Sequence, residues 1–225
     1  MIVAIIPARG GSKRLPRKNV LPFAGRPLLA WSVLAARASL SVGATWVSTD
    51  DEEIAATGTA HGAQIVRRPK ELAGDEIPTI DVIRHALLHI RAQGLVVDAV
   101  MTLQPTNPMR PLNMIEQAID EFRSTPCDSL VSVSQRALKV GSIHDGYYIP
   151  NYTFGQQSRL TSPLTYENGL LYITRAGCIE DGSLCGERIR AFLSPRPYDE
   201  IDIDDAIDLK IGEAIAMQLL KQLGY

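Results

Sequence analysis

Residues 2–19 read IVAIIPARGGSKRLPRKN and join a short apolar segment, residues 2–6, to a loop with five cations and two adjacent glycines. The apolar segment is typical of a buried strand. In a parallel α/β sheet, the loop after the first strand is the usual place for phosphate. We therefore expect a phosphate-binding loop at this point of the chain. The residues expected to contact the anion are Gly10 and Gly11 through backbone N–H groups, and Arg9, Lys13 and Lys18 through their side chains.

Charge is divided unevenly along the chain. Residues 1–49 contain seven Lys or Arg and no acidic residue, whereas residues 50–225 contain 16 basic and 25 acidic residues, so that the formal net charge is only -2. A compact basic segment favours a small polyanionic ligand over nucleic acid, which requires basic residues spread along a face. The sequence has no apolar run near the ~20 residues of a membrane span. We expect a cytoplasmic protein that binds neither nucleic acid nor membrane.

The three cysteines, Cys127, Cys178 and Cys185, form an odd set without CxxC spacing. This pattern argues against a disulfide framework and against a structural zinc site.

Strand patterns alternate with helix patterns along most of the chain, which predicts a Rossmann-like, three-layer α/β/α fold with a mostly parallel sheet. Residues 134–172 depart from this alternation, because turn residues there separate short aromatic or β-branched runs. We expect one domain, residues 1–225, with residues 134–172 as an inserted β-hairpin region. Strands are expected at residues 2–6, 44–48, 64–66, 99–103 and 129–133, and helices at residues 27–35, 50–61, 79–93, 112–124 and 205–223. In the last helix, Ile207, Ile211, Ala214, Ile215, Leu219 and Leu223 are expected to form one apolar stripe.

The segment at residues 198–205, YDEIDIDD, is strongly acidic. In an extended chain Asp202 and Asp204 point to one side, while the isoleucines between them point to the other. Two carboxylates on one side suit Mg²⁺, which takes one or two carboxylates and completes its shell with water and phosphates. Helix capping by Asp205 and Asp208 is the alternative, and both functions are compatible. We expect Asp202 and Asp204 to bind the metal.

Two proline-containing loops follow predicted strands, RPKELAGD at residues 68–75 and LQPTNPMRP at residues 103–111. Prolines prevent these segments from forming helices and make them rigid. In the second loop, Gln104, Thr106 and Asn107 can donate and accept hydrogen bonds, which suits the hydroxyls of a sugar.

Six motifs taken together, IPARGGSKRLPRKN, VSTDDEEIA, RRPKELAGD, LQPTNPMRP, the NG of YENGLLYIT, and EIDIDDAIDL, resemble the N-acylneuraminate cytidylyltransferase (CMP-sialic acid synthetase) family of bacterial type. The resemblance runs along nearly the whole chain. It implies a carbohydrate-biosynthetic enzyme that transfers CMP from CTP to a sialic, legionaminic or pseudaminic acid. It also implies Mg²⁺ as cofactor and a homodimer, in which residues 134–172 dimerise and reach the partner's active site.

The resemblance also implies roles for individual residues. Arg9, Lys13, Lys18 and Asp204 would be catalytic, and Asp202 and Asp204 would bind the metal. The nucleotide would be bound by Arg9, Gly10, Gly11, Ser12, Lys13, Lys18, Asn19, Arg68 and Thr79. The sugar would be bound by Gln104, Thr106, Lys139, Arg159, Asn168 and Gly169, with Arg159 as the first candidate for the sugar carboxylate and Lys139 as the second.

Three other functions share part of this pattern. A Kdo cytidylyltransferase shares the fold and the donor. A sugar-1-phosphate nucleotidyltransferase shares the glycine-rich amino-terminal loop and a GxP element, here Gly25 to Pro27. A nucleotide-binding regulator without catalytic activity is the alternative outside enzymes.

Overall fold

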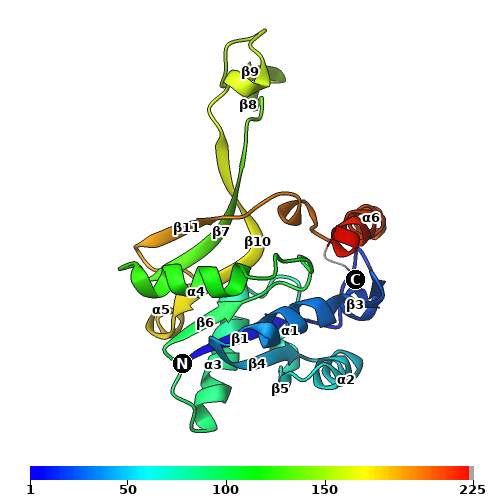
Figure 1. Ribbon diagram of the computed structural model, residues 1–225, viewed down its shortest axis with the longest axis vertical. Helices are drawn as coiled ribbons and strands as arrows, with labels where there is room; N and C mark the ends of the chain where they lie inside the picture. Colours follow the sequence, from blue (N-terminus) through cyan, green and yellow to red (C-terminus); the bar gives the residue numbers. More distant parts are fainter. Residues whose placement is uncertain (223–225) are drawn as a thin grey trace.

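The structure is a computed structural model that describes residues 1–222. A seven-stranded sheet forms its centre, in the order β11-β7-β10-β6-β1-β4-β5 (Figure 1). Its neighbouring strands are parallel except where β10 lies between β6 and β7. The mostly parallel Rossmann-like sheet is therefore confirmed. The strands of this sheet are β1 (Ile2–Pro7), β4 (Val42–Thr49), β5 (Gln64–Arg67), β6 (Ala99–Thr102), β7 (Ser129–Arg136), β10 (Leu164–Arg175) and β11 (Ile189–Leu193).

Helices cover both faces of this sheet, and β1 shows why. Its even-numbered residues, such as Ile6, join the core beneath one group of helices, and its odd-numbered residues, such as Ile5, join the core beneath the other. Successive side chains of a strand point to opposite faces, so a wholly apolar strand must be covered on both sides. The first group contains α1 (Leu28–Ala38), α2 (Glu52–Ala60) and α4 (Met114–Ser124), and the second contains α3 (Thr79–Ala92) and α5 (Ala176–Glu180).

The ends of α2 and α3 follow their local sequence. The Asp51 carboxylate accepts a hydrogen bond from the Ile54 N–H and so caps the start of α2. Gly94 lies just beyond α3 with φ +86°, a conformation that glycine adopts without strain. The helix expected at residues 50–61 therefore begins two residues later, at Glu52, and the helix expected at residues 79–93 ends one residue earlier, at Ala92.

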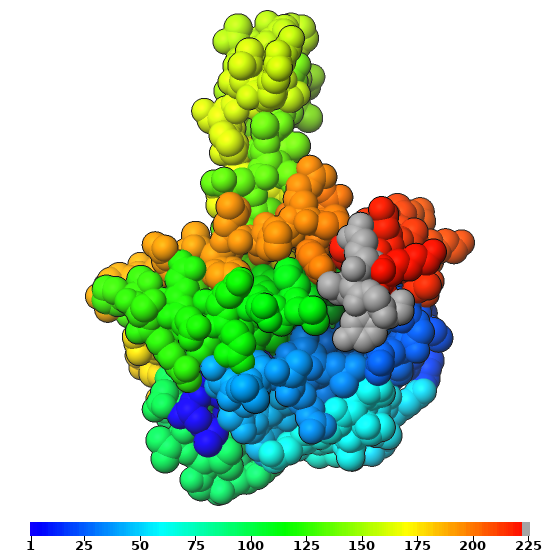
Figure 2. Space-filling view, in the orientation of Figure 1, coloured from blue at the N-terminus to red at the C-terminus, as the bar shows by residue number. Residues whose placement is uncertain are grey.

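Residues 134–172 include an arm that stands away from the rest of the molecule (Figures 1 and 2). Strands β7 and β10 continue beyond the sheet as an antiparallel pair, and the hairpin of β8 (Gly141–His144) and β9 (Tyr147–Pro150) lies at its tip. The arm exposes large apolar side chains, including Tyr147 at 77 % and Phe154 at 81 %.

The carboxyl-terminal helix α6 (Ala206–Gln222) packs on residues 201–203 and on the small hairpin of β2 (Pro22–Phe23) and β3 (Arg26–Pro27). Gly212 makes this approach close, because a Cβ there would lie 2.6 Å from the Ile203 side chain. The expected apolar stripe forms the buried face only in part: Leu219 is buried, but Ile207 is 67 % and Ile211 55 % exposed, and Ala216, outside the stripe, is buried. Leu223, the end of the predicted stripe, lies outside the described residues.

No helix within residues 1–222 combines the length and the apolar character needed to cross a bilayer.

Candidate active site

Two hydrogen bonds within the protein hold the basic loop after β1 in place, and one of them uses the Gly10 N–H that was expected to contact the anion. The buried Asn19 side chain donates to the Arg9 carbonyl at 3.0 Å, and the Gly10 N–H donates to the Asp50 carboxylate at 3.0 Å. A Cβ at Gly10 would lie 2.9 Å from Asp51, the residue that caps α2. A Cβ at Gly11 would meet no protein atom within 4 Å. Gly10 is thus required for packing, whereas Gly11 leaves the loop open on one side.

Two cations of this loop turn toward one carboxylate. Arg9 Nη2 lies 2.6 Å from Asp75 Oδ1, and Lys13 Nζ lies 2.5 Å from Asp75 Oδ2. The hydrogen bond from Lys13 is the main reason that the pKa of Asp75 is lowered, and the charge of Arg9 adds to it. A carboxylate here carries the kind of charge that a phosphate oxygen would bring.

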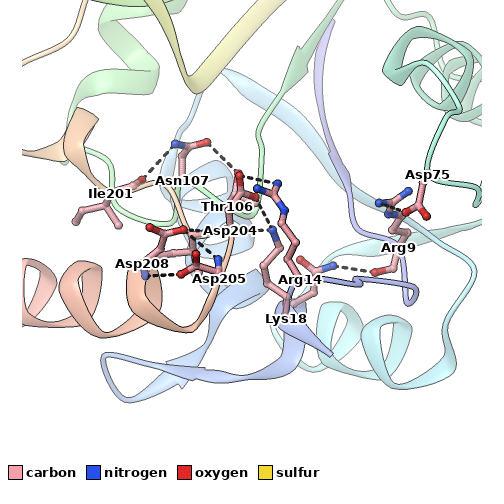
Figure 3. A network of polar contacts seen from close by, with 12 residues as sticks. Arg9, Arg14, Lys18, Asp75, Thr106, Asn107, Ile201, Asp204, Asp205 and Asp208 are labelled. Carbon is pink, nitrogen blue, oxygen red and sulfur yellow. Dashed lines mark hydrogen bonds and ion pairs between the residues drawn. The ribbon is translucent and has the colours of Figure 1, made fainter. Parts of the chain in front are cut away.

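The other end of the chain supplies the second carboxylate, Asp204 (Figure 3). Lys18 Nζ lies 3.1 Å from Asp204 Oδ1, and Arg14 Nη2 lies 2.8 Å from Asp204 Oδ2. Burial acts to raise the pKa of Asp204, but the hydrogen bonds and charges of Lys18 and Arg14 outweigh it and hold that pKa below its usual value. The amino-terminal cations and the carboxyl-terminal acids therefore meet in space.

The acidic segment has the alternation that the sequence predicts. Ile201 is 1 % and Ile203 is 0 % exposed, whereas Asp202 lies at the surface. Although the residue is exposed, neighbouring atoms remove its carboxyl group partly from water, and this desolvation, followed by the negative charge of Asp204, raises the pKa of Asp202. Capping is also present, because the Asp205 side chain accepts from Asp208 N and the Asp208 side chain accepts from Asp205 N (Figure 3).

Arg9, Lys18, Asp75 and Asp204 border a cleft of about 420 Å³, whereas Lys13 and Asp202 do not line it. Arg68 forms part of its wall and donates to the Ser48 carbonyl at 2.7 Å; burial lowers the pKa of Arg68 to about 10. The cleft is lined by nine of the residues predicted for the site: Arg9, Ser12, Lys18, Asn19, Arg68, Thr79, Gln104, Thr106 and Asp204.

The buried Asn107 side chain joins the loop after β6 to two other parts of the site. It donates to the Asn168 carbonyl at 3.0 Å and to the Ile201 carbonyl at 3.2 Å. Gly169 has φ +75°, and a Cβ there would lie 3.0 Å from Gln104 Oε1 and closer still to the Asn107 side chain. The turn of Asn168 and Gly169 thus supports the residues that line the cleft.

The Asn168 side chain itself lies within the sheet. Its Oδ1 accepts from Ser132 Oγ at 2.7 Å, and its Nδ2 donates to Ser134 Oγ at 3.0 Å. Its contacts fix the bulge at which β10 shifts register against β7.

Lys139 and Arg159, the two candidates for the sugar carboxylate, lie on the arm. Lys139 Nζ is 5.6 Å from the centre of the Tyr152 ring, and Arg159 Nε donates to Gln157 Oε1 at 2.7 Å. Neither residue lines the cleft of its own chain.

Sequence reasoning did not assign roles to Arg14, Asp75 and Arg110. Arg14 and Asp75 lie within the basic loop and the first proline-containing loop. Arg14 forms an ion pair with Asp204 and Asp75 forms one with Lys13, and the local sequence gives no signal for either pair. Among residues 1–222 no group of three or more His, Cys, Asp or Glu side chains is arranged to hold a metal, so any metal at Asp202 and Asp204 would need further ligands from substrate or water.

Comparison with known proteins gives consistent matches. A family model described as Cytidylyltransferase matches residues 3–147. The chain is 34 % identical to CMP-N,N'-diacetyllegionaminic acid synthase of Legionella pneumophila, covering 95 % of both chains. It is 32 % identical to N-acylneuraminate cytidylyltransferase A of Danio rerio, covering all of this chain but only 52 % of that protein.

A solved structure of CMP:2-keto-3-deoxy-manno-octonic acid synthetase complexed with CTP has the same fold. The two structures superpose with a TM-score of 0.70 and are 18 % identical in sequence, and the match covers 96 % of this chain and 98 % of the synthetase chain.

Proposed function

This chain belongs to the cytidylyltransferase family, and from that premise we propose that it transfers CMP from CTP to the anomeric hydroxyl of a nonulosonic acid and releases pyrophosphate. The observation that carries the proposal is the shared cleft, where Lys18 of the basic loop contacts Asp204 of the acidic segment. Its volume of about 420 Å³ is in the range of small-molecule sites. Cations suited to phosphates and a loop suited to sugar hydroxyls border the same space.

The basic loop would bind the triphosphate. In this reaction the sugar oxygen bonds to the α-phosphorus, the bond from that phosphorus to the bridging oxygen breaks, and pyrophosphate leaves with its negative charge. Arg9, Lys13 and Lys18 are the side chains suited to stabilise that charge. Arg9 and Lys13 now contact Asp75, so the phosphates would replace the Asp75 carboxylate as their partner.

Asp202 and Asp204 fit a magnesium ion. Both offer the carboxylate oxygens that Mg²⁺ prefers, and the raised pKa of Asp202 reflects its burial first and the negative charge of Asp204 second. When bound, the metal would neutralise charge on the phosphates. Arg14 and Lys18 keep Asp204 ionised, which is the state that a metal ligand needs.

Gln104 and Thr106 would bind the sugar, with the turn of Asn168 and Gly169 behind them. The Legionella pneumophila relative, by its name, makes an activated legionaminic acid and matches this chain over 95 % of its length. The chain spans about half of the Danio rerio relative, named for N-acylneuraminate. We propose a nonulosonic acid as the substrate class, and a reaction that takes place where CTP is made available, in the cytoplasm.

We also propose a homodimer. Lys139 and Arg159 are remote from their own cleft, and the arm that carries them exposes apolar side chains such as Tyr147 and Phe154. Paired arms would cover these side chains and bring Arg159 or Lys139 to the partner's sugar. Light scattering should give a mass of about twice 24.6 kDa, and a monomer at micromolar concentration would refute this arrangement.

The function is tested with a panel of acceptors. Pyrophosphate release is measured with CTP and Mg²⁺ against sialic, legionaminic and pseudaminic acids, Kdo and glucosamine 1-phosphate. Release with one of the three nonulosonic acids supports the proposal. Release with Kdo alone, or with a sugar phosphate alone, identifies one of the alternative enzymes, and calorimetric CTP binding without release for any acceptor identifies a regulator.

A further inference from the structure

Arg110 is a buried arginine behind the sugar side of the cleft. Its residue exposure is 8 %, and it does not line the cleft. A guanidinium has five N–H donors and is positively charged at neutral pH, so its burial is costly unless the donors are satisfied. The contacts of Arg110 therefore indicate what its charge is used for.

Its contacts are three oxygens from three different elements. Nε donates to the Leu170 carbonyl at 2.7 Å, Nη2 to the Gln104 carbonyl at 3.1 Å, and Nη1 to Ser32 Oγ at 3.0 Å. Two of the acceptors are backbone carbonyls, and no carboxylate in residues 1–222 forms an ion pair with this guanidinium. Burial lowers the pKa of Arg110 to about 9.

Both carbonyls belong to residues that shape the sugar side. The Gln104 carbonyl is held by Arg110 and also accepts from Ser32 Oγ at 3.3 Å, while the Gln104 side chain lines the cleft. Leu170 directly follows Gly169, whose surface lies against Gln104 Oε1. The guanidinium thus connects the backbone of Gln104 to the turn at Gly169, which contacts the Gln104 side chain.

We propose that Arg110 is a positioning residue for the acceptor sugar, which fixes Gln104 and the turn at Gly169 relative to each other before the sugar binds. Because its hydrogen bonds go to Leu170, Gln104 and Ser32 and not to the basic loop, its loss should weaken acceptor binding and leave CTP binding unchanged. This role rests on the proposed function for its substrate. The clamp itself, by which we mean the hydrogen bonds from Arg110 to the Gln104 and Leu170 carbonyls, can be tested without any substrate.

Lysine is the informative replacement, because it keeps the charge but lacks the planar fork that reaches several acceptors at once. In Arg110→Lys we expect the KM for the acceptor to rise about tenfold, with the calorimetric Kd for CTP changed by less than about twofold. Ser32→Ala removes one contact of the same network and should raise the acceptor KM by a smaller factor. Arg68→Lys, on the nucleotide side, should show the opposite split, with the KM for CTP raised.

Hydrogen–deuterium exchange gives the readout that does not need an acceptor. In Arg110→Lys and in Ser32→Ala, backbone amides of residues 103–107 and 168–171 should exchange faster, while those of residues 9–20 should not change. Unchanged exchange in both segments would overturn the clamp, as would equal loss of CTP and acceptor binding. If the wild-type protein uses no nonulosonic acid, the proposed function and the sugar role both fail, and the exchange result still decides the clamp.

Discussion

Lys18 Nζ lies 3.1 Å from Asp204 Oδ1, although the two residues are 186 positions apart in the chain. The contact exists because α6 and the small hairpin of β2 and β3 bring residues 201–204 against the loop after β1. The cations and the carboxylates of the proposed reaction therefore come from opposite ends of one chain.

Asp204→Asn should abolish turnover, with a loss of at least about 100-fold in kcat, because it removes a charge that the phosphates and their metal would need. The fold should remain, since Asn keeps the shape of the side chain. Asp120→Asn, on the exposed side of α4, is the matched control and should retain activity. Substantial magnesium-dependent activity in the Asp204 variant would rule out the metal assignment.

Asp75→Asn should tighten CTP binding measured without metal by about threefold, because the phosphates would no longer have to displace the Asp75 carboxylate, whose ion pairs near the surface are weak. Arg9 and Lys13, its present partners, would then be free for the nucleotide. Glu76→Gln removes a neighbouring charge and controls for the general effect of net charge. Weaker binding in the Asp75 variant, beyond that control, would mean that Asp75 itself helps to hold the ligand.

Gly169→Ala should raise the acceptor KM by about tenfold or more, because the new Cβ would push against the Gln104 and Asn107 side chains. Gly146→Ala is a matched control at the tip of the arm: its φ of +83° is equally unfavourable for alanine, but the Cβ meets no atom within 4 Å. In urea titrations Gly146→Ala should lose about 1 kcal/mol of stability from the strained φ alone, and Gly169→Ala should lose more because its Cβ also meets Asn107 and Gln104. Equal acceptor KM values in the two variants would show that Gly169 does not affect sugar binding.

Glu116 should make stability depend on pH. Hydrogen bonds from Ser41 and Ser39 lower the pKa of its carboxyl group to about 2, below the value of about 4.3 expected in the unfolded chain. The contribution of Glu116 to the free energy of unfolding is therefore complete above its pKa in the unfolded chain. It is lost as the pH falls toward its pKa in the folded protein. Glu116→Gln should reduce stability at pH 6 by on the order of 1 kcal/mol and should match the wild-type protein near pH 2. A difference that stays constant from pH 6 to pH 3 would contradict this assignment.

The sequence predicts the elements whose pattern is local. Strand β1 is apolar throughout, and α2 and α3 carry their own end signals in Asp51 and Gly94. Strand β10 was not predicted, because the bulge at Asn168 interrupts its alternation and its partners β6 and β7 are distant in sequence. In α6 the most apolar side chains, Ile207 and Ile211, are exposed, because the close approach to Ile203 selects the face with Gly212.

The residues of the site also divide into those that a local sequence pattern predicts and those that depend on distant partners. The basic loop and the pair Asp202 and Asp204 are visible in the sequence, because each is a compact run of one charge. Asp75 and Arg110 are not, because their partners are a pair of distant cations and two distant backbone carbonyls. Hydrogen bonds to backbone atoms leave no trace in composition or spacing, so positioning residues emerge only from coordinates.

The most direct test follows the α-phosphorus of the nucleotide. The protein is incubated with Mg²⁺, a nonulosonic acid and CTP labelled at the α-phosphate, and the products are separated. We predict that the label appears in a CMP-sugar, with one unlabelled pyrophosphate released for each molecule formed. Label that stays in CTP with every nonulosonic acid, while Kdo or a sugar phosphate accepts it, would contradict the account.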